Sequence, residues 1–265
     1  MAKTQIGAQL YTLRDFMKTP PDIAKSLKKV RGIGYEAVQV SGLGPIDPGE
    51  LRKILDGEGL LACSTHMGYD RITGDTAKVI EENKILGAKH PVCPGLPGEL
   101  HNADGYKKAA AMLTKAGEAM YKAGLVLSYH NHGIEFEKYG DKLGIEILMG
   151  ESDPRFFKME LDTYWAQYGG ADPVQWCVKF KGRLPLLHCK DMAIVKNQPL
   201  MAEVGEGNLN WKAIIDACKK GGTEWYLVEQ DVCQRDPFDC LKTSLENMKI
   251  GCHKTRSFKN GEQVS

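Results

Sequence analysis

Short apolar runs alternate with amphipathic stretches along most of the chain. The apolar runs predict strands at residues 5–10, 35–40, 60–66, 89–93, 125–129, 156–161, 184–187 and 225–228. The stretches between them predict helices at residues 20–30, 47–58, 73–86, 102–123, 140–150, 172–181, 208–220 and 237–249. The strand runs are apolar on both faces, as parallel sheets covered by helices require. Eight strand–helix units close into a barrel, so we predict the α/β class and a single (β/α)8 TIM barrel.

Residues that favour helix ends support these boundaries. Asp47 can cap the second helix before Pro48, Asp75 falls in the first turn of the third, and Gly124 can end the long fourth helix. No Gly-x-Gly-x-x-Gly motif follows the first strand, which argues against a dinucleotide-binding sheet. We therefore place one barrel domain at residues 1–252 and a polar C-terminal extension at residues 253–265.

Length, charge and hydrophobicity limit the kinds of partner that the protein can have. The chain has 265 residues, close to the roughly 250 of a typical barrel, and a formal net charge of +1. A nucleic-acid groove needs a basic stripe, so we expect no nucleic-acid partner. No apolar run approaches the roughly 20 residues that span a membrane, so we expect no membrane association.

The cysteines and the N-terminus indicate a compartment. None of the eight cysteines forms a C-x-x-C pair, and several lie in apolar runs, as buried thiols do. A chain of this length needs no disulfide staples, so we expect reduced thiols and a cytoplasmic location. The start of the chain lacks the apolar segment of a secretory signal, although a trimmed leader peptide would leave no trace.

Potential metal ligands follow the last four strand runs. Asp162, His188 and Glu229 each stand at the end of such a run, where the strands of a barrel converge on one face. A buried carboxylate is costly unless it is paired or binds a cation. We therefore predict that these three residues bind one divalent metal ion. The ordinary alternatives are acids that cap the next helix and a hydrogen-bonded core histidine.

The fourth ligand is either His130 or Glu135, which both belong to the end of the fifth strand run. We favour Glu135 because hard ions such as Mn²⁺ and Mg²⁺ prefer oxygen, whereas a shell with two histidines would favour Zn²⁺, Co²⁺ or Mn²⁺. The residue that does not bind the metal is expected to contact substrate.

Further side chains near the predicted mouth of the barrel are candidates for substrate binding. His66 ends the third strand run, Trp165 could stack on a sugar face, and Lys190 could bind a carboxylate or an oxyanion. Each has an ordinary alternative: a structural histidine, a core aromatic and a solvated lysine. Glu206 lies between two glycines and either contacts substrate or only belongs to a loop. The full set of candidate substrate-binding residues is His66, His130, His132, Trp165, Lys190 and Glu206.

Several motifs together indicate a family. They are Tyr129-His130-Asn131-His132 with Glu135-Phe136, Leu161-Asp162-Thr163, His188-Cys189-Lys190-Asp191, Gly205-Glu206-Gly207 with Trp211, and Glu229-Gln230-Asp231. With these motifs the chain resembles, over nearly its whole length, the sugar phosphate isomerase/epimerase superfamily of xylose isomerase-like barrels. The resemblance implies one divalent ion held by Glu, Asp, His and Glu from strands five to eight, of which the last three match Asp162, His188 and Glu229. Many relatives carry Glu where this chain has His130, and this departure is similar to the inosose dehydratase and 3-keto-sugar branches.

The resemblance also implies a chemistry. A metal ion (Mn²⁺, Zn²⁺, Co²⁺ or Mg²⁺) polarises a carbonyl and stabilises an enediolate, while a carboxylate or histidine removes the neighbouring proton. Glu135 and Glu229 could each serve as ligand, as base, or as both. We expect an isomerase or epimerase of a keto-sugar or related polyol. The alternative is a lyase or dehydratase that acts on a keto-inositol or a 3-keto-glycoside, and the spacing of the residues does not separate the two.

Two other functions are alternatives, and the sequence favours neither of them. A DNA-repair (AP) endonuclease shares this fold, but it needs a basic face and a richer set of ligands for three zinc ions than seven histidines and a charge of +1 offer. A non-catalytic sugar-binding protein would not need a complete metal shell. We expect a small sugar as the partner, unphosphorylated because no Gly-rich phosphate loop is present. A homo-oligomer is left open, by analogy with similar barrels.

Overall fold

A closed barrel of eight parallel strands forms the centre of the protein, which confirms the predicted fold class. The computed structural model describes residues 5–250, so the predicted extension at residues 253–265 lies outside the described part of the chain. Around the barrel the strand order is β1-β12-β9-β8-β5-β4-β3-β2. The barrel strands are β1 (Gln5–Gln9), β2 (Ala37–Val40), β3 (Leu61–His66), β4 (His90–Cys93), β5 (Leu127–His130), β8 (Phe157–Asp162), β9 (Leu186–Cys189) and β12 (Trp225–Val228).

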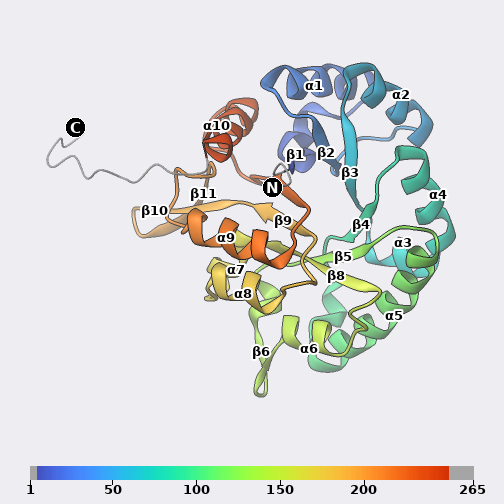
Figure 1. Cartoon of the computed structure of the whole chain (residues 1–265), viewed down its shortest axis with the longest axis vertical. Helices are drawn as coiled ribbons and strands as arrows, with labels where there is room; N and C mark the ends of the chain where they lie inside the picture. The colour runs from blue at the N-terminus through green and yellow to red at the C-terminus, as the bar shows by residue number, and fades with distance from the viewer. Residues whose placement is uncertain (1–4, 251–265) are drawn as a thin grey trace, which may run out of the picture.

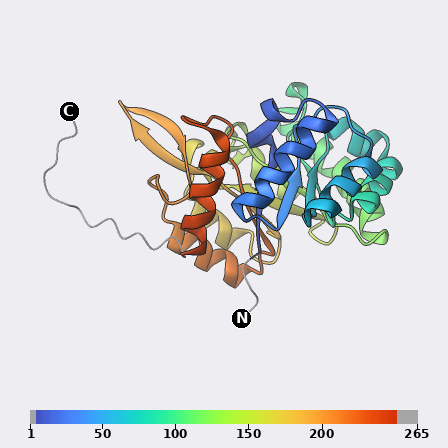
Figure 2. The ribbon, with the colours of Figure 1, turned by 90° about the horizontal axis from the view of Figure 1, so that it is seen from above.

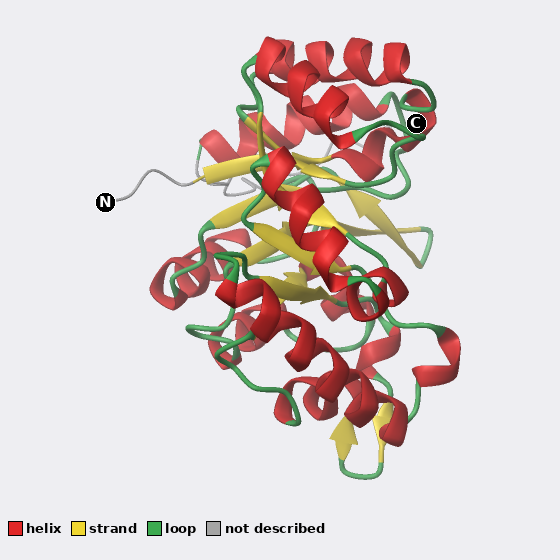
Figure 3. Cartoon of the chain, turned by 90° about the vertical axis from the view of Figure 1, so that its right-hand side faces the viewer, coloured by secondary structure: helices red, strands yellow, loops and turns green. Residues whose placement is uncertain are grey.

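Helices surround the strands (Figures 1 and 3). The main outer helices are α1 (Pro20–Ile33), α2 (Pro48–Glu58), α4 (Thr76–Leu86), α5 (Ala103–Lys122), α6 (Gly144–Gly150), α8 (Pro173–Lys179), α9 (Trp211–Gly221) and α10 (Pro237–Lys249). Their apolar faces and the outward side chains of the strands form one large core, which includes Leu113 of α5 and Leu161 of β8. Within residues 5–250, no helix is long and apolar enough to cross a membrane.

Local chemistry explains where the helices begin and end. The Asp47 side chain accepts hydrogen bonds from the backbone N–H groups of Gly49 and Glu50, so it caps α2 as predicted. The third predicted helix starts later than expected, because Asp75 accepts from the N–H of Lys78 and is the N-cap of α4. The residues before it form a separate short helix, α3 (Tyr69–Gly74). Gly124 follows α5 with a φ of +84°, which suits glycine.

Several elements at the carboxyl ends of the strands were not predicted. A hairpin of β10 (Asp191–Val195) and β11 (Gln198–Ala202) follows β9 and projects from the barrel beside α10 (Figure 2). Short 3-10 helices, η1 (Leu10–Phe16), η2 (Gly98–Leu100) and η3 (Ile134–Phe136), and α7 (Thr163–Tyr168) occupy other loops. The helix predicted at 140–150 is shorter, since β6 (Lys138–Tyr139) and β7 (Lys142–Leu143) form a small hairpin before α6. These elements lacked a long periodic pattern in the sequence.

The strand register places polar side chains at one end of the barrel interior. Glu160 and Asp162 are two residues apart on β8, so both point to the same side, while Leu161 points outward. Asp162 pairs with His188 of β9, and Glu160 pairs with His130 of β5. A separate apolar cluster lies two residues earlier on several strands and fills the barrel below these polar groups: Ala37, Cys63, Val92, Leu186 and Leu227. This apolar layer therefore lies directly beneath the polar groups at the carboxyl ends of the strands.

Candidate metal centre

Four side chains from four strand ends meet in what we call the rim cluster: His130, Asp162, His188 and Glu229. One ligand atom from each lies within 4.8 Å of the others. All four side chains are buried, with Glu229 the most exposed at 4%. The barrel topology therefore brings the three predicted ligands together, and it adds His130 as a fourth.

The geometry of the rim cluster fits a metal ion. Nδ1 of His188 lies 3.1 Å from Oε2 of Glu229 and 3.7 Å from Oδ2 of Asp162. Bonds of about 2.0–2.2 Å place neighbouring ligand atoms of one ion roughly 3–3.5 Å apart, close to these separations.

Two buried atoms of the rim cluster lack a hydrogen-bond partner: Oδ2 of Asp162 and Nδ1 of His130. Oδ2 of Asp162 does lie 2.9 Å from the Nζ of Lys190, without the angles of a hydrogen bond. The other oxygen, Oδ1, accepts from the N–H of Trp165 and caps α7, and the Asp162 N–H donates to Oδ1 of Asn131. The carboxylate is thus held with one oxygen toward the cluster, as a metal ligand requires.

Lys190 is fully buried, which excludes the solvated-lysine alternative. Its Nζ lies 2.6 Å from Oε2 of Glu229, 2.7 Å from Oδ2 of Asp231 and 2.9 Å from Oδ2 of Asp162. Burial alone would lower the pKa of Lys190, but these three carboxylates outweigh burial and raise it. For Glu229, burial would raise the pKa, whereas Lys190 and His188 hold it well below its usual value. Lys190 is thus a built-in cation among the acids.

A second polar group lies deeper in the barrel and centres on Glu160. This residue was not among those predicted from the sequence to belong to the site. Its Oε2 lies 2.9 Å from Nε2 of His66, 3.1 Å from Nε2 of His188 and 3.6 Å from Nδ1 of His130. Its Oε1 accepts a hydrogen bond of 2.7 Å from Nε2 of Gln39. Burial would raise the pKa of Glu160, but His188 and His66 outweigh it and hold the pKa at about 2. Strand alternation could have found Glu160, since it shares a face with Asp162.

His188 connects the two groups through its two ring nitrogens. Nδ1 faces Glu229, while Nε2 faces Glu160 and also lies 2.6 Å from Oε1 of Gln39. Burial would lower the pKa of His188, but Glu160 and Glu229 raise it. For His130, burial lowers the pKa well below its usual value, and His188 and His132 add to this effect. His130 is therefore neutral, the form that binds metal ions.

Glu135 lies outside both groups, although the sequence favoured it over His130 as the fourth ligand. Its Oε1 accepts from the hydroxyl of Tyr129 and its Oε2 from the N–H of His132, each at 2.7 Å. Tyr129 and His130 are adjacent on β5 and so point to opposite sides of the strand. Glu135, bonded to Tyr129, is on the outer side, whereas His130 points into the barrel. The structure thus brings His130, rather than Glu135, to the other three residues.

The remaining candidates lie around the mouth. His66 is at the end of β3, with its ring centroid 5.3 Å from that of His130. The ring of Trp165 lies 5.5 Å from that of His132, and the Nζ of Lys190 lies 5.6 Å from the Trp165 ring. The indole Nε1 of Trp165 is buried and has no hydrogen-bond partner. These aromatic side chains form a surface that could stack on a sugar and donate a hydrogen bond to it.

The Glu206 side chain is directed toward α10. The N–H groups of Gly205 and Gly207 donate to Oδ2 of Asp191, at 2.9 and 3.0 Å, which wraps the turn around that carboxylate. The Glu206 side chain accepts from Nδ2 of Asn247 on α10, at 2.9 Å. This contact ties the loop to α10 and does not reach the rim cluster.

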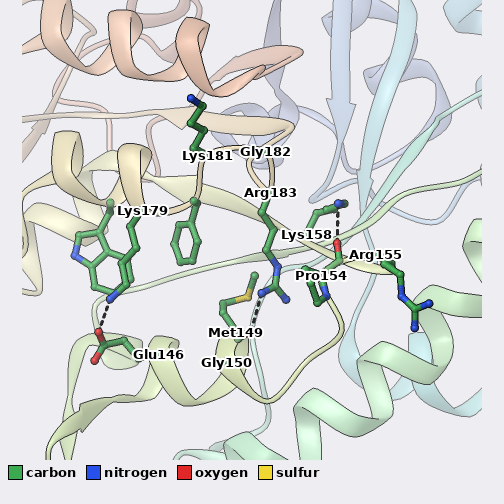
Figure 4. Close-up of a pocket in the computed structure, with 12 residues that line it drawn as sticks. Glu146, Met149, Gly150, Pro154, Arg155, Lys158, Lys179, Lys181, Gly182 and Arg183 are labelled. Carbon is green, nitrogen blue, oxygen red and sulfur yellow. Dashed lines mark hydrogen bonds and ion pairs between the residues drawn. The ribbon is translucent and has the colours of Figure 1, made fainter.

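A pocket of about 580 Å³ lies elsewhere, between α6 and α8 (Figure 4). Several of its residues precede β8 and β9, so it opens at the end of the barrel opposite the rim cluster. It is rich in basic side chains, three of which have partners: Lys179 pairs with Glu146, Lys158 donates to the backbone oxygen of Pro154, and Arg183 donates to that of Met149. The pocket is thus separate from the proposed chemistry.

The fold agrees with the comparison to known proteins. The chain belongs to the xylose isomerase-like TIM barrel family, whose model matches residues 27–249. It is similar to the rhizopine catabolism protein MocC of Rhizobium meliloti, with 26% identity over 85% of this chain and 80% of that protein. It is 24% identical to an inosose dehydratase of Geobacillus kaustophilus, over 63% of this chain and 61% of the dehydratase.

Solved structures show the same similarity. The structure of a sugar phosphate isomerase/epimerase from Parabacteroides distasonis is 26% identical and superimposes with a TM-score of 0.78, covering 94% of both chains. The family resemblance inferred from the motifs is confirmed.

Proposed function

We propose that this protein is a divalent-metal-dependent enzyme that removes a proton from the carbon next to the carbonyl of a keto-sugar or related polyol, as an isomerase or epimerase. The observation that carries the proposal is the meeting of His130, Asp162, His188 and Glu229 in one buried cluster at the mouth of the barrel. Oδ2 of Asp162 and Nδ1 of His130 make no hydrogen bond in that cluster, which supports a bound ion.

The donor set indicates the kind of ion. Two imidazole nitrogens and two carboxylate oxygens suit Zn²⁺, Co²⁺ or Mn²⁺ better than Mg²⁺, which prefers an oxygen shell. Bound there, such an ion would act as a Lewis acid that polarises the substrate carbonyl and stabilises the negative charge that develops on its oxygen.

The protein side chains supply the remaining roles. Glu229 is ionised because Lys190 and His188 lower its pKa, so it can accept the proton from carbon. Lys190 keeps its own proton and balances the negative charge of the carboxylates around the site. We assign His66 and His132 to the binding of substrate hydroxyl groups and Trp165 to stacking on the sugar ring, because these rings lie close to one another beside the rim cluster.

A lyase that acts on a keto-inositol or 3-keto-glycoside is the second candidate, and two observations favour it. The chain is similar to an inosose dehydratase. His130 also stands where the resemblance implies a carboxylate, and Glu135 points away, so the cluster lacks one of the two glutamates expected there. Epimerisation must return the proton to the opposite face, whereas elimination needs one base and a proton for the leaving oxygen.

The test combines metal analysis with solvent exchange. Purified protein would be loaded with Zn²⁺, Mn²⁺ or Co²⁺ and incubated in D₂O with a panel of keto-sugars, keto-inositols and 3-keto-glycosides. Deuterium uptake into an isomeric product would support an isomerase or epimerase, and loss of water or of the aglycone would support the lyase. Glu224→Gln, at the opposite end of the barrel, is the control. Binding without exchange in the metal-loaded protein would instead indicate a sugar-binding protein.

A further inference from the structure

We propose that a second pocket in the barrel binds a divalent transition-metal ion of its own. We call it the inner pocket; it consists of His66, His130, Glu160 and His188, of which His66 and Glu160 do not belong to the rim cluster. The inference goes beyond the proposed function, which needs only an ion at the rim.

The inner pocket has the dimensions of a ligand shell. One ligand atom from each of its four side chains lies within 4.8 Å of the others. Oε2 of Glu160 is 2.9, 3.1 and 3.6 Å from nitrogens of His66, His188 and His130. Ligand atoms that share one ion are roughly 3–3.5 Å apart when each bond is about 2.0–2.2 Å. Three imidazoles therefore already face a single carboxylate oxygen at the spacing that a shared ion requires.

The charge of Glu160 also calls for a cation. The side chain is completely buried, and it contacts Gln39 and the three imidazoles. Between residues 5 and 250, no lysine or arginine is paired with it, and the ammonium of Lys190 is bound to Asp162, Glu229 and Asp231 instead. A buried carboxylate is costly without a compensating positive charge.

Surrounding groups hold the ligands in a binding orientation. Gln39 donates to the other oxygen of Glu160 and so orients that carboxylate, while its own oxygen lies 2.6 Å from Nε2 of His188, a contact that an ion at Nε2 would replace. Nδ1 of His66 lies 3.2 Å from Nε2 of Gln9 and 3.4 Å from Oγ of Ser41, and these contacts hold the ring with Nε2 toward Glu160. Glu229 lies 3.1 Å from Nδ1 of His188, which resembles the carboxylate–histidine–metal arrangement of many metal sites.

The donor set predicts which ions bind. Three nitrogens and one oxygen favour Zn²⁺, Co²⁺ or Cu²⁺ and disfavour Mg²⁺ and Ca²⁺. His188 offers Nε2 to the inner pocket and Nδ1 to the rim cluster. A neutral imidazole has one free lone pair, so the two pockets compete for this ring. The test must therefore disable one pocket at a time.

The decisive experiment uses the double variant Asp162→Asn/Glu229→Gln, which removes the two carboxylates that belong to the rim cluster and are not ligands of the inner pocket. Equilibrium dialysis with Co²⁺ and elemental analysis should still find one equivalent of bound metal. Adding His66→Gln or Glu160→Gln should then weaken binding by more than ~10-fold, because each change removes a direct ligand. A double variant that is folded and binds no Co²⁺, or one in which these additions change nothing, would overturn the proposal; the Glu160 charge would then be balanced by protonated histidines alone.

A second measurement does not depend on the double variant folding. In the otherwise unchanged protein, His66→Gln should alter the visible ligand-field spectrum of bound Co²⁺, because a nitrogen ligand is lost. Glu224→Gln is the matched control for Glu160→Gln, since Glu224 also pairs with a histidine nitrogen (His90, 3.3 Å) but at the other end of the barrel. An unchanged spectrum in His66→Gln counts against the inner pocket, whereas full activity and metal content in Asp162→Asn counts against the rim site, so the two failures are distinguishable.

Discussion

The Nζ atom of Lys190 lies 2.6 Å from Oε2 of Glu229 in a site closed to solvent. The same ammonium is within 2.9 Å of Asp162 and 2.7 Å of Asp231, so one fixed cation is shared by three acids. Burying these charges costs desolvation free energy. Removing one partner is also destabilising, because it leaves an uncompensated buried charge. It also allows carboxylates to gather at the rim before any metal ion is bound.

Lys190→Met tests this role of the buried ammonium. We expect the metal-free protein to lose about 3–5 kcal/mol of unfolding free energy, because three acids are left without their cation. Added Zn²⁺ or Mn²⁺ should restore part of the loss, since an ion bound to the same carboxylates replaces the missing charge. Urea unfolding with and without metal provides the measurement. Lys212→Met, which removes an exposed lysine paired with Asp216, should change little, and equal stability of both variants would contradict the expectation.

Asp162→Asn separates metal binding from folding. Asparagine caps helices as well as aspartate does, so α7 should keep its first turn while the cluster loses a charged oxygen ligand. We expect metal affinity at the rim to fall by more than the ~10–100-fold typical of outer-shell changes, and exchange activity to fall with it. Asp172→Asn is a matched control, because Asp172 caps α8 in the same way. Retention of rim metal and full activity in Asp162→Asn would refute the site.

His130→Gln and Glu135→Gln decide the fourth ligand. His130→Gln should reduce metal content, because it removes an imidazole from the rim cluster. Glu135→Gln should leave metal content unchanged but destabilise the protein by about 1–3 kcal/mol, since an amide cannot accept hydrogen bonds from both Tyr129 and His132 as the carboxylate does. Elemental analysis and thermal unfolding of the two variants give the answer. Loss of metal in Glu135→Gln but not in His130→Gln would instead identify Glu135 as the fourth ligand.

The Glu224 carboxylate, at the other end of the barrel, should make the free energy of unfolding depend on pH. A hydrogen bond from His90, followed by the contacts with Lys89, lowers the pKa of Glu224 from 4.5 to about 2. Because the folded-state pKa is depressed, the stabilisation is complete above the unfolded value and is lost as the pH falls from about 4.5 to about 2. The effect should stay below ~1 kcal/mol, since the carboxylate is 42% exposed. Urea unfolding of wild type and Glu224→Gln should converge across this window; a gap that widens on acidification would contradict the assignment.

The sequence alone determined the architecture and most of the rim cluster. The strand runs are apolar on both faces and alternate with helical periodicity, and this pattern suits a helix-covered parallel barrel. Because every strand of such a barrel ends on the same face, Asp162, His188 and Glu229 could be brought together without coordinates. The last predicted helix, at residues 237–249, matches α10.

Only the tertiary structure decided which inward side chains are neighbours and at which depth. Periodicity tells that Glu160 shares a face with Asp162, but the register across the closed barrel places it among three histidines. The direction of Glu135 depends on hydrogen bonds to Tyr129 and His132, and the burial of Lys190 depends on acids from two other strand ends. These relationships arise between segments far apart in the chain, so no local pattern of hydrophobic and polar residues records them.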